Sequence, residues 1–482
     1  MVVIGGGVSG SAVAAELAAT GHVEVTVLER GPAGQLAGST GHAPGFVGVL
    51  GEVPVLTDLA RLSAGMYEQL HHHGKVGFDR VGGLEVARSK AGWSRLMRRA
   101  AMAQAAGLPA QLLTAGETVD QAPDLVDPAG CVGGVFFAAD GTARARVITA
   151  ALQEQAHAAG ARFRHGATVT GIRATADGTS PAWTVCTADR DLPADDVVLA
   201  CGIWGRQVAA LASLRVPLVP VAHPYVHGPL RASAVIGSPF VRWPEHHVYA
   251  RDHGDRLGMG SYAHAPIPVD VEDFGSGAEL PWRADFDTVI SEAMNLLPPR
   301  QRFDVRTRLN GVFSMTADNL PLLGPIDQVP GMWVAQALWV THAAGAALPG
   351  AGHDRSTVRS RRHGDAAPGP LRHPTRARPH RRIAAPLQRH LRHHLSTSPA
   401  PLPVGDRQTV GQTRFSIGRR CRSGPPAGSL TACSLVLGNR PMADIVVTSQ
   451  CSGTANSAAR RARWKARNCR TCRPSAWACT VM

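Results

Sequence analysis

The residues best suited to chemistry stand at the start of the chain, where GGGVSG (residues 5–10) follows a short apolar run. Gly5, Gly7 and Gly10 fit G-x-G-x-x-G, which permits a tight turn, close approach of a pyrophosphate and close packing of helix on strand. The amides at the start of the following helix favour phosphate. Glu29, nineteen residues after Gly10, is placed to bind a ribose hydroxyl pair. The pattern predicts a dinucleotide site without choosing between FAD and NAD; the alternative is a glycine-rich turn without a ligand.

A second candidate is His42, which lies in the segment GSTGHAPG (residues 38–45). Small residues precede it and permit close approach of the backbone to a ligand, while Pro44 stiffens the exit. An imidazole on such a loop is suited to a covalent link with the edge of a large planar cofactor. The alternative is a loop histidine that only makes hydrogen bonds.

The elements that must position these residues follow from the hydrophobic pattern. A strand, a helix that runs to Ala19 and stops at Gly21, and a second strand that ends at Glu29 form the first unit. Apolar runs bounded by turn residues predict the strands of the nucleotide sheet, namely 2–4, 23–28, 197–201 and 332–340. Residues 166–173 and 183–186 are expected to pair as strands. Alternating β-branched and aromatic residues in 81–87 and 216–263 predict a second, antiparallel sheet over the cofactor.

Nine segments together resemble one known family. They are GGGVSG with VLERG and GSTGHAPG, then VGGLEVA (81–87), ADGTARAR (139–146), ADDVVLACGIWG (194–205), HGDRLGMGSYAH (253–264), GVFSMTADNLPLLGP (311–325) and WVAQALWVTHAAG (333–345). In order and spacing they resemble the D-amino-acid-oxidase-like, FAD-dependent amine oxidoreductases, in the branch of dimethylglycine oxidase and of dimethylglycine and sarcosine dehydrogenases. The resemblance extends from residue 1 to about 346.

The resemblance implies an α/β fold, α+β overall, in which a Rossmann-like FAD-binding domain is interleaved with an antiparallel-sheet substrate domain. The expected order is FAD-binding 1–80, substrate 81–137, FAD-binding 138–215, substrate 216–304, FAD-binding 305–347 and a disordered basic tail 348–482. WVTHAAG (339–345) is expected to turn into a helix whose first amides face the flavin.

The resemblance also implies site residues. His42 matches the histidine joined to the 8α-methyl of FAD, and His223 and Tyr249 match the catalytic pair. Ala250 departs from the family, which often has an aromatic residue there. The alternatives are a satisfied sheet histidine for His223 and a core aromatic for Tyr249. The residues expected to contact FAD are Gly5, Gly6, Gly7, Val8, Ser9, Gly10, Glu29, Arg30, Gly38, Ser39, Thr40, His42, Val169, Cys201, Gly202, Trp339, Val340, Thr341 and His342.

The implied activity is oxidative demethylation of a small N-methylated amino acid, dimethylglycine or sarcosine, by hydride transfer to flavin N5. The acceptor is oxygen or an electron-transfer protein. A second hypothesis is oxidation of another small amine or amino acid. A third, of another class, is a truncated, frame-shifted product without catalysis.

Composition divides the chain at about residue 350. Residues 1–350 carry a net charge of −6 and three cysteines, whereas residues 351–482 carry +20 and six cysteines with no Glu or Tyr. The early part predicts a cytoplasmic protein, since it shows no leader, membrane span, disulfide framework or metal motif. High charge with few apolar residues predicts disorder in the tail.

The origin of the tail has three interpretations. The favoured one is a shifted reading frame in a GC-rich gene, since the family resemblance stops abruptly. A basic segment that binds nucleic acid or membrane, and a zinc site at Cys469 and Cys472, are the others; we expect neither partner and no metal. No folate-binding domain is readable.

Two features are expected to lie on the solvent-exposed surface without a chemical role. His71, His72 and His73 end an amphipathic segment and are interpreted as the exposed end of a helix. Arg95, Arg98 and Arg99 are interpreted as a basic, solvated helix face.

Overall fold

The glycine-rich unit folds as the sequence predicts. Strand β1 (Val2–Ile4) leads into helix α1 (Val8–Ala19), and β2 (Thr26–Glu29) returns parallel to β1. The computed structural model describes residues 1–175, 182–232, 238–326 and 329–347. These residues all belong to one compact unit of the chain. The expectations for the tail, which are disorder, a zinc site at Cys469 and Cys472, and the shifted frame, lie outside the described residues.

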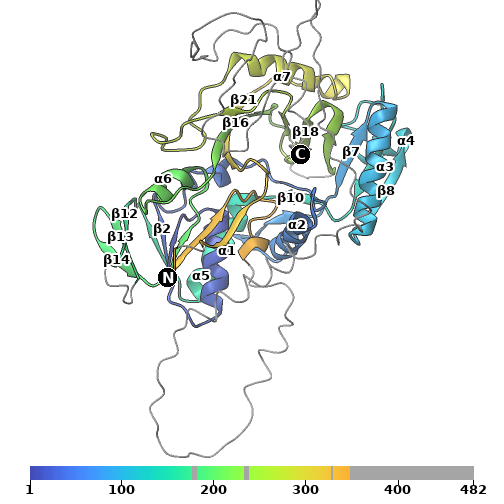
Figure 1. The fold of residues 1–482 in the computed structure, drawn as a ribbon. Helices are drawn as coiled ribbons and strands as arrows, with labels where there is room; N and C mark the ends of the chain where they lie inside the picture. The colour runs from blue at the N-terminus through green and yellow to red at the C-terminus, as the bar shows by residue number, and fades with distance from the viewer. Residues whose placement is uncertain (176–181, 233–237, 327–328, 348–482) are drawn as a thin grey trace, which may run out of the picture. The chain divides into compact units, whose positions relative to one another are not determined.

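A six-stranded sheet carries the nucleotide half, in the order β11-β2-β1-β15-β23-β22. Figure 1 labels its strand β2 and the helix α1 that packs on the sheet. The further strands of the sheet are β11 (Arg162–His165), β15 (Val197–Leu199), β22 (Leu322–Pro325) and β23 (Met332–Gln336). All pairs are parallel except β22 with β23. The strand expected to reach residue 340 ends at Gln336, because Ala337 adopts a left-handed conformation (φ 54°) that breaks the extended chain.

The centre of this sheet is buried on both faces, which explains why β1 and β15 are apolar at every position. Val3, Val27 and Val198 pack against α1 and α5 (Ala145–Ala158). Val2 and Leu199 face a three-stranded sheet instead. That sheet consists of β12 (Val169–Ala174), β13 (Trp183–Thr187) and β14 (Asp191–Ala194), so the predicted pairing of 166–173 with 183–186 is confirmed.

A nine-stranded sheet forms the second half. Eight strands follow the order β20 (Ile267–Pro268), β16 (Val219–His227), β19 (Leu257–Ser261), β18 (Val248–Asp252), β17 (Phe240–Trp243), β7 (Gly83–Ala87), β9 (Gly133–Phe137) and β8 (Ala110–Thr114), and β21 (Thr307–Met315) pairs with β16. The prediction of an antiparallel sheet is wrong at one pair, because β17 runs parallel to β7. These two strands come from distant parts of the chain, so no hairpin dictates their relative direction.

The two faces of this sheet differ in character. Val241 and Ala250 belong to an apolar cluster with Ile290 of α7 (Ala284–Met294), which covers one face. Their neighbours Arg242 and Tyr249 point the other way, because successive side chains alternate across a strand. The alternation therefore delivers polar and aromatic groups to the face opposite α7.

The remaining elements connect these layers. The helices are α2 (Pro54–Tyr67), α3 (Lys90–Ala105), α4 (Ala115–Gln121) and α6 (Gly205–Ala210), and the short strands are β3 (Phe46–Val47), β4 (His71–His72), β5 (Lys75–Val76), β6 (Phe78–Asp79) and β10 (Gly141–Ala143). None of the helices in the described part of the chain has the length and apolarity to cross a bilayer.

The histidine run does not end a helix, so that expectation is wrong. Helix α2 stops at Tyr67, and His71 and His72 form β4, which pairs with β5. His73 and Gly74 both have positive φ (47° and 72°), and this turn produces the hairpin.

The prediction of a fully solvated arginine face on α3 is wrong for Arg99. Its guanidinium donates to both carboxylate oxygens of Glu85, at 2.7 and 2.9 Å, and its side chain is only 14% exposed. Helical spacing turns Arg99 toward β7, where Glu85 needs a partner because it is buried.

Candidate active site

The glycines at the start of α1 are required by the backbone around them. A Cβ on Gly5, whose φ is +110°, would lie 2.4 Å from the Ala200 carbonyl oxygen. A Cβ on Gly10 would lie 1.9 Å from the Gly5 carbonyl oxygen. The contacts are with main-chain atoms, which cannot move aside, so the turn leaves no room for a side chain at either position.

Glu29 is oriented by amides of the same turn. Its carboxylate accepts hydrogen bonds from the amides of Gly6 (2.7 Å) and Gly31 (2.8 Å). An ionised carboxylate has about four acceptor sites, so acceptor capacity is left for a further donor. Glu29 lines the cavity described below, which is the placement predicted for a ribose-binding acid.

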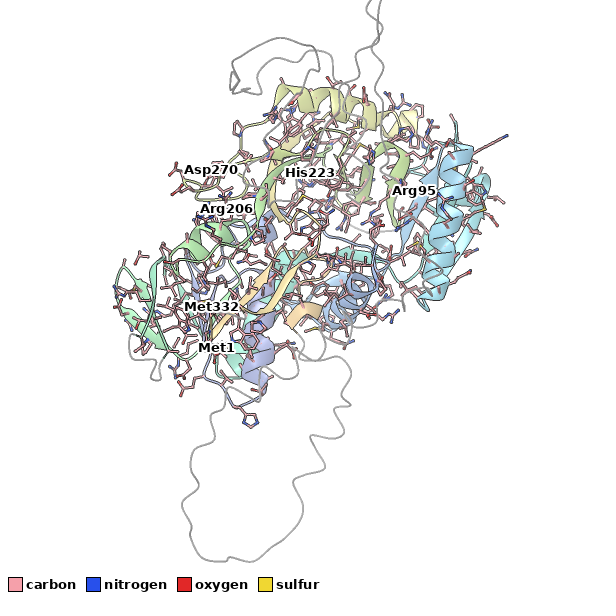
Figure 2. All side chains as sticks on the ribbon, viewed as in Figure 1. Met1, Arg95, Arg206, His223, Asp270 and Met332 are labelled. Carbon is pink, nitrogen blue, oxygen red and sulfur yellow. The ribbon has the colours of Figure 1, made fainter. Side chains whose placement is uncertain are left out.

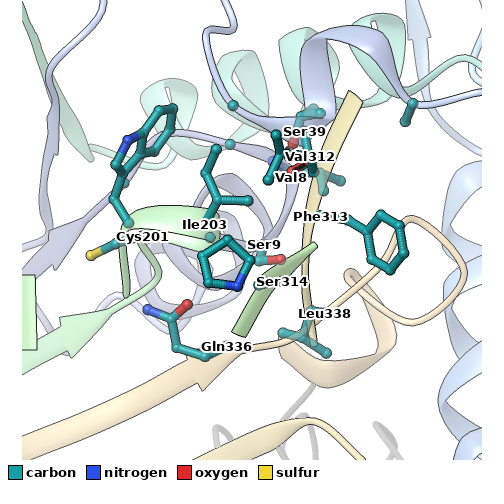
Figure 3. A pocket seen from close by; sticks show the side chains of 18 of the residues that line it. Val8, Ser9, Ser39, Cys201, Ile203, Val312, Phe313, Ser314, Gln336 and Leu338 are labelled. Atoms are coloured by element: carbon teal, nitrogen blue, oxygen red, sulfur yellow. Dashed lines mark hydrogen bonds between the residues drawn. The ribbon is translucent and has the colours of Figure 1, made fainter. Parts of the chain in front are cut away.

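The loop that carries His42 lies against this turn. Thr40 accepts a hydrogen bond from the Val8 amide at the start of α1 (3.2 Å), and Ser39 donates to the Val312 carbonyl (2.6 Å; Figure 3). The His42 Nε2 atom is buried without a hydrogen-bond partner. Burial, reinforced by Arg146, lowers the pKa of His42 to about 4. The imidazole is therefore neutral at physiological pH.

One cavity of about 1100 Å³ joins this region to the nine-stranded sheet. Figure 2 marks three lining residues from different segments, Arg206, His223 and Asp270. The predicted site residues that line it are Gly5, Gly7, Val8, Ser9, Glu29, Arg30, Gly38, Ser39, Thr40, His42, Val169, Cys201, Gly202, His223, Tyr249, Trp339, Val340 and Thr341. Gly6, Gly10 and His342 are among the predicted residues but do not line it.

His223 and Tyr249 meet at the sheet end of the cavity. His223 Nε2 and Tyr249 Oη are joined by a hydrogen bond of 2.6 Å, and the ring of Tyr262 stacks on His223 with centroids 4.1 Å apart. His223 lies within β16, in the range predicted to form the second sheet. Burial lowers the pKa of His223 well below its usual value and raises the pKa of Tyr249. The pair is thus a neutral imidazole and a neutral phenol.

The sequence prediction missed Arg242, which also lines the cavity. It stands opposite Tyr249 in the β17–β18 register, and its guanidinium lies 5.0 Å from the ring centroid of Phe240. Within the described part of the chain its side chain forms no ion pair and donates no hydrogen bond. The signal available in the sequence was the alternation of FVRW, which sets Arg242 apart from its apolar neighbours.

The segment after β23 turns toward a helix, as expected, but only the first turn of that helix lies in the described residues. It forms turns up to a short 3-10 helix, η5 (Gly345–Ala347), where the described residues end. Contacts with distant elements hold these turns: the Tyr67 hydroxyl donates to the Val340 carbonyl (2.7 Å), and the Thr341 hydroxyl donates to the Phe46 carbonyl (3.1 Å). The left-handed Ala337 directs the chain along the cavity before any helix begins.

Cys201 lines the cavity but is not a nucleophile. Its thiol donates to the Ile4 carbonyl (3.2 Å), and burial, with a contribution from Glu29, raises its pKa to about 12. In the described residues no cluster of three His, Cys, Asp or Glu side chains has a geometry for a metal ion. At the sheet end of the cavity the groups suited to chemistry include His223, Tyr249 and Arg242.

Comparison with known proteins gives this arrangement a family. The family described as DAO, FAD dependent oxidoreductase, matches residues 1–348. The chain belongs to this family. It is 30% identical over 379 residues to mitochondrial dimethylglycine dehydrogenase of Homo sapiens, covering 71% of this chain and 41% of that protein. It is also 30% identical over 344 residues to mitochondrial sarcosine dehydrogenase of Homo sapiens, covering 69% and 37%.

The solved structure of glycine oxidase from Geobacillus kaustophilus has the same fold. The TM-score is 0.60 at 25% identity, over 72% of this chain and 91% of the other. The chain spans about 40% of the length of the two dehydrogenases.

The cavity suits the FAD that defines the family. At Gly7 a Cβ would meet only the Thr40 hydroxyl, at 3.2 Å, so the space in front of the α1 N-terminus is open for a phosphate. Glu29 offers a carboxylate to a ribose, and the partnerless His42 Nε2 faces a glycine-lined wall. The residues present therefore fit a dinucleotide at this end of the cavity.

Proposed function

We propose that this chain catalyses FAD-dependent oxidative demethylation of a small N-methylated amino acid, dimethylglycine or sarcosine, with FAD bound covalently through His42. FAD, when bound, supplies the two-electron oxidation of the C–N unit. The second candidate, oxidation of another small amine, uses the same residues and differs only in what binds beside them.

The His223–Tyr249 pair is suited to the proton chemistry of this reaction. An amine must lose its ammonium proton before its carbon can be oxidised, so the site needs an acceptor. The neutral imidazole of His223 has a lone pair, and the 2.6 Å hydrogen bond to Tyr249 connects that lone pair to the cavity. In this proposal the pair holds and relays the substrate proton.

The observation that carries the choice of an amino acid is Arg242. A guanidinium that lines a cavity without an acceptor in the described residues provides up to five N–H donors for an anion. The aromatic face of Phe240 supports its position without neutralising its charge. A carboxylate bound here would place the neighbouring amine beside Tyr249, the cross-strand partner of Arg242.

The test compares dimethylglycine with 2-dimethylaminoethanol, which replaces the carboxylate by a hydroxymethyl group. Anaerobic flavin reduction is followed by visible absorbance, and formaldehyde is assayed after mixing with acceptor. We expect dimethylglycine to be preferred, and Arg242→Met to raise the half-saturating concentration of dimethylglycine about 10- to 100-fold, the worth of a charge-assisted hydrogen bond. Arg98→Met, exposed on α3, is the control.

Equal reduction by both compounds in the unaltered chain would contradict the amino-acid assignment and favour the second candidate. No reduction by any amine would support the third hypothesis, a chain without catalysis.

A further inference from the structure

The carbonyl groups on either side of His42 are each bound by an arginine from another part of the fold. Arg146 of α5 donates from Nε to the Gly41 carbonyl at 2.8 Å. Arg251 of β18 donates from Nη1 to the Pro44 carbonyl, also at 2.8 Å. The two contacts come from the two halves of the molecule and enclose a segment of four residues. Such contacts remove the backbone freedom that a glycine-rich loop otherwise keeps.

Arg251, which binds the Pro44 carbonyl, is a buried cation. It is 3% exposed, and it forms no ion pair within the described residues. A buried cation without a carboxylate is costly, so its retention calls for a specific contact. Gly45, with φ +81°, makes that contact possible, because a Cβ there would lie 2.9 Å from Arg251 Nη1 and 2.0 Å from the Ala143 carbonyl oxygen.

The ring of His42 is held against glycines. A Cβ on Gly277 would lie 3.0 Å from its Cε1, and a Cβ on Gly311 would lie 3.2 Å from its Cδ2. The niche therefore fits the edge of an imidazole closely. With the loop fixed on both sides, the ring has little freedom to leave this niche.

We propose that Arg146 and Arg251 are positioning residues that fix His42 for covalent attachment to FAD. This inference rests on the proposed covalent link. Attachment breaks one C–H bond at the flavin 8α carbon and one imidazole N–H bond and forms one C–N bond. The two electrons and two protons pass to dioxygen, which becomes hydrogen peroxide. The step needs a neutral imidazole held within bonding distance, and precise placement of reacting groups is worth several orders of magnitude in rate.

The experiment measures covalent flavin directly, apart from turnover. Full-length chain prepared without flavin is mixed with FAD in air, samples are precipitated with acid at intervals, and flavin is measured in pellet and supernatant. The set contains the unaltered chain, His42→Ala, Arg146→Met, Arg251→Met and Arg251→Lys. Arg302→Met is the matched control, because Arg302 also donates to a backbone carbonyl, that of Leu297 (3.2 Å), away from this loop.

We expect Arg251→Met to slow attachment at least 10-fold, Arg146→Met to slow it less because Arg146 is exposed, and Arg302→Met to have no effect. Arg251→Lys should recover part of the rate, since an ammonium can still donate to the Pro44 carbonyl. The FAD bound to each chain before precipitation, whether covalent or not, should stay near one per chain in the folded variants.

Attachment at the unaltered rate in Arg251→Met and Arg146→Met overturns the positioning role. If Arg251→Met does not melt cooperatively, the test rests on Arg146→Met. An unaltered rate of attachment in Arg146→Met then overturns the positioning role. The covalent link itself is overturned if the unaltered chain carries no covalent flavin or if His42→Ala retains covalent flavin. The positioning role of the two arginines then fails with it.

Discussion

The two ends of the cavity are built from different parts of the polypeptide. At the nucleotide end the contacts come from main-chain atoms: carbonyl groups of Ala200 and Gly5 confine Gly5 and Gly10, and the amides of Gly6 and Gly31 orient Glu29. At the sheet end the contacts come from side chains on separate strands, namely His223 on β16 and Tyr249 on β18. A site made of backbone tolerates almost no added atom, whereas a site made of side chains tolerates changes in shape and responds to changes in chemistry.

Glycines on both sides illustrate this difference. A Cβ on Gly10 would meet backbone, the Gly5 carbonyl oxygen, at 1.9 Å. A Cβ on Gly260 would meet the end of a side chain, Tyr249 Oη, at 2.4 Å. The same added methyl group therefore has different consequences in the two places, because a tyrosine ring can rotate and a peptide in a tight turn cannot.

The largest effect is expected from Gly10→Ala. The methyl group should open the turn in front of α1, and we expect loss of FAD binding together with a lower melting temperature. Gly260→Ala should fold and keep FAD, while reducing it slowly because Tyr249 is displaced from His223. Flavin-to-protein ratios and thermal melts of the two variants make the test. If Gly10→Ala retains FAD as well as Gly260→Ala does, the backbone-built description of the nucleotide end is wrong.

The next effect is expected from the side-chain pair. Tyr249→Phe and His223→Ala should slow flavin reduction by substrate about 10²- to 10⁴-fold if the pair carries the proton. Both variants should keep full FAD, since neither residue contributes to the glycine turn. Stopped-flow reduction at saturating substrate is the measurement. Reduction at the unaltered rate in both variants would leave the pair with a packing role.

The smallest effect concerns the pH dependence of stability, through Asp140, which is buried beside Gly83 of β7. Burial raises its pKa to about 7 from an ordinary 3.8, although it accepts a hydrogen bond from the Val49 amide (2.7 Å). Between these values the unfolded chain loses the proton while the folded chain keeps it, so Asp140 lowers stability as pH rises from about 4 to 7. Asp140→Asn removes this dependence and keeps an acceptor.

Urea unfolding at pH 5 and pH 8 tests this expectation. The stability of Asp140→Asn relative to the unaltered chain should rise between the two pH values by at most about 3 kcal/mol, since pH 5 lies about two units below the folded pKa of about 7 and one pKa unit corresponds to about 1.4 kcal/mol. A difference that does not change with pH would show that Asp140 does not titrate in this range.

The sequence predicted the nucleotide half of the fold well because the patterns that indicate it are local. The turn at residues 5–10, the acid at Glu29 and the apolar strands all lie within short stretches whose spacing is readable without a structure. The direction of β7 beside β17, the inward turn of Arg99 and the hairpin at His71–His72 were mispredicted. Each depends on a partner that is distant in the sequence, or on a positive φ at a residue type that rarely adopts one.

By itself the sequence determined the family, the glycine turn and the histidine loop, because a close approach of backbone to ligand leaves only small residues in a set order. Only the tertiary structure decided that Arg242 stands in register with Tyr249, and that Arg146 and Arg251 meet the loop of His42 from two sides. The two arginine contacts with the loop join elements that are more than a hundred residues apart in the sequence. Their geometry follows from sheet register and from the burial of both sheets, which no local pattern records.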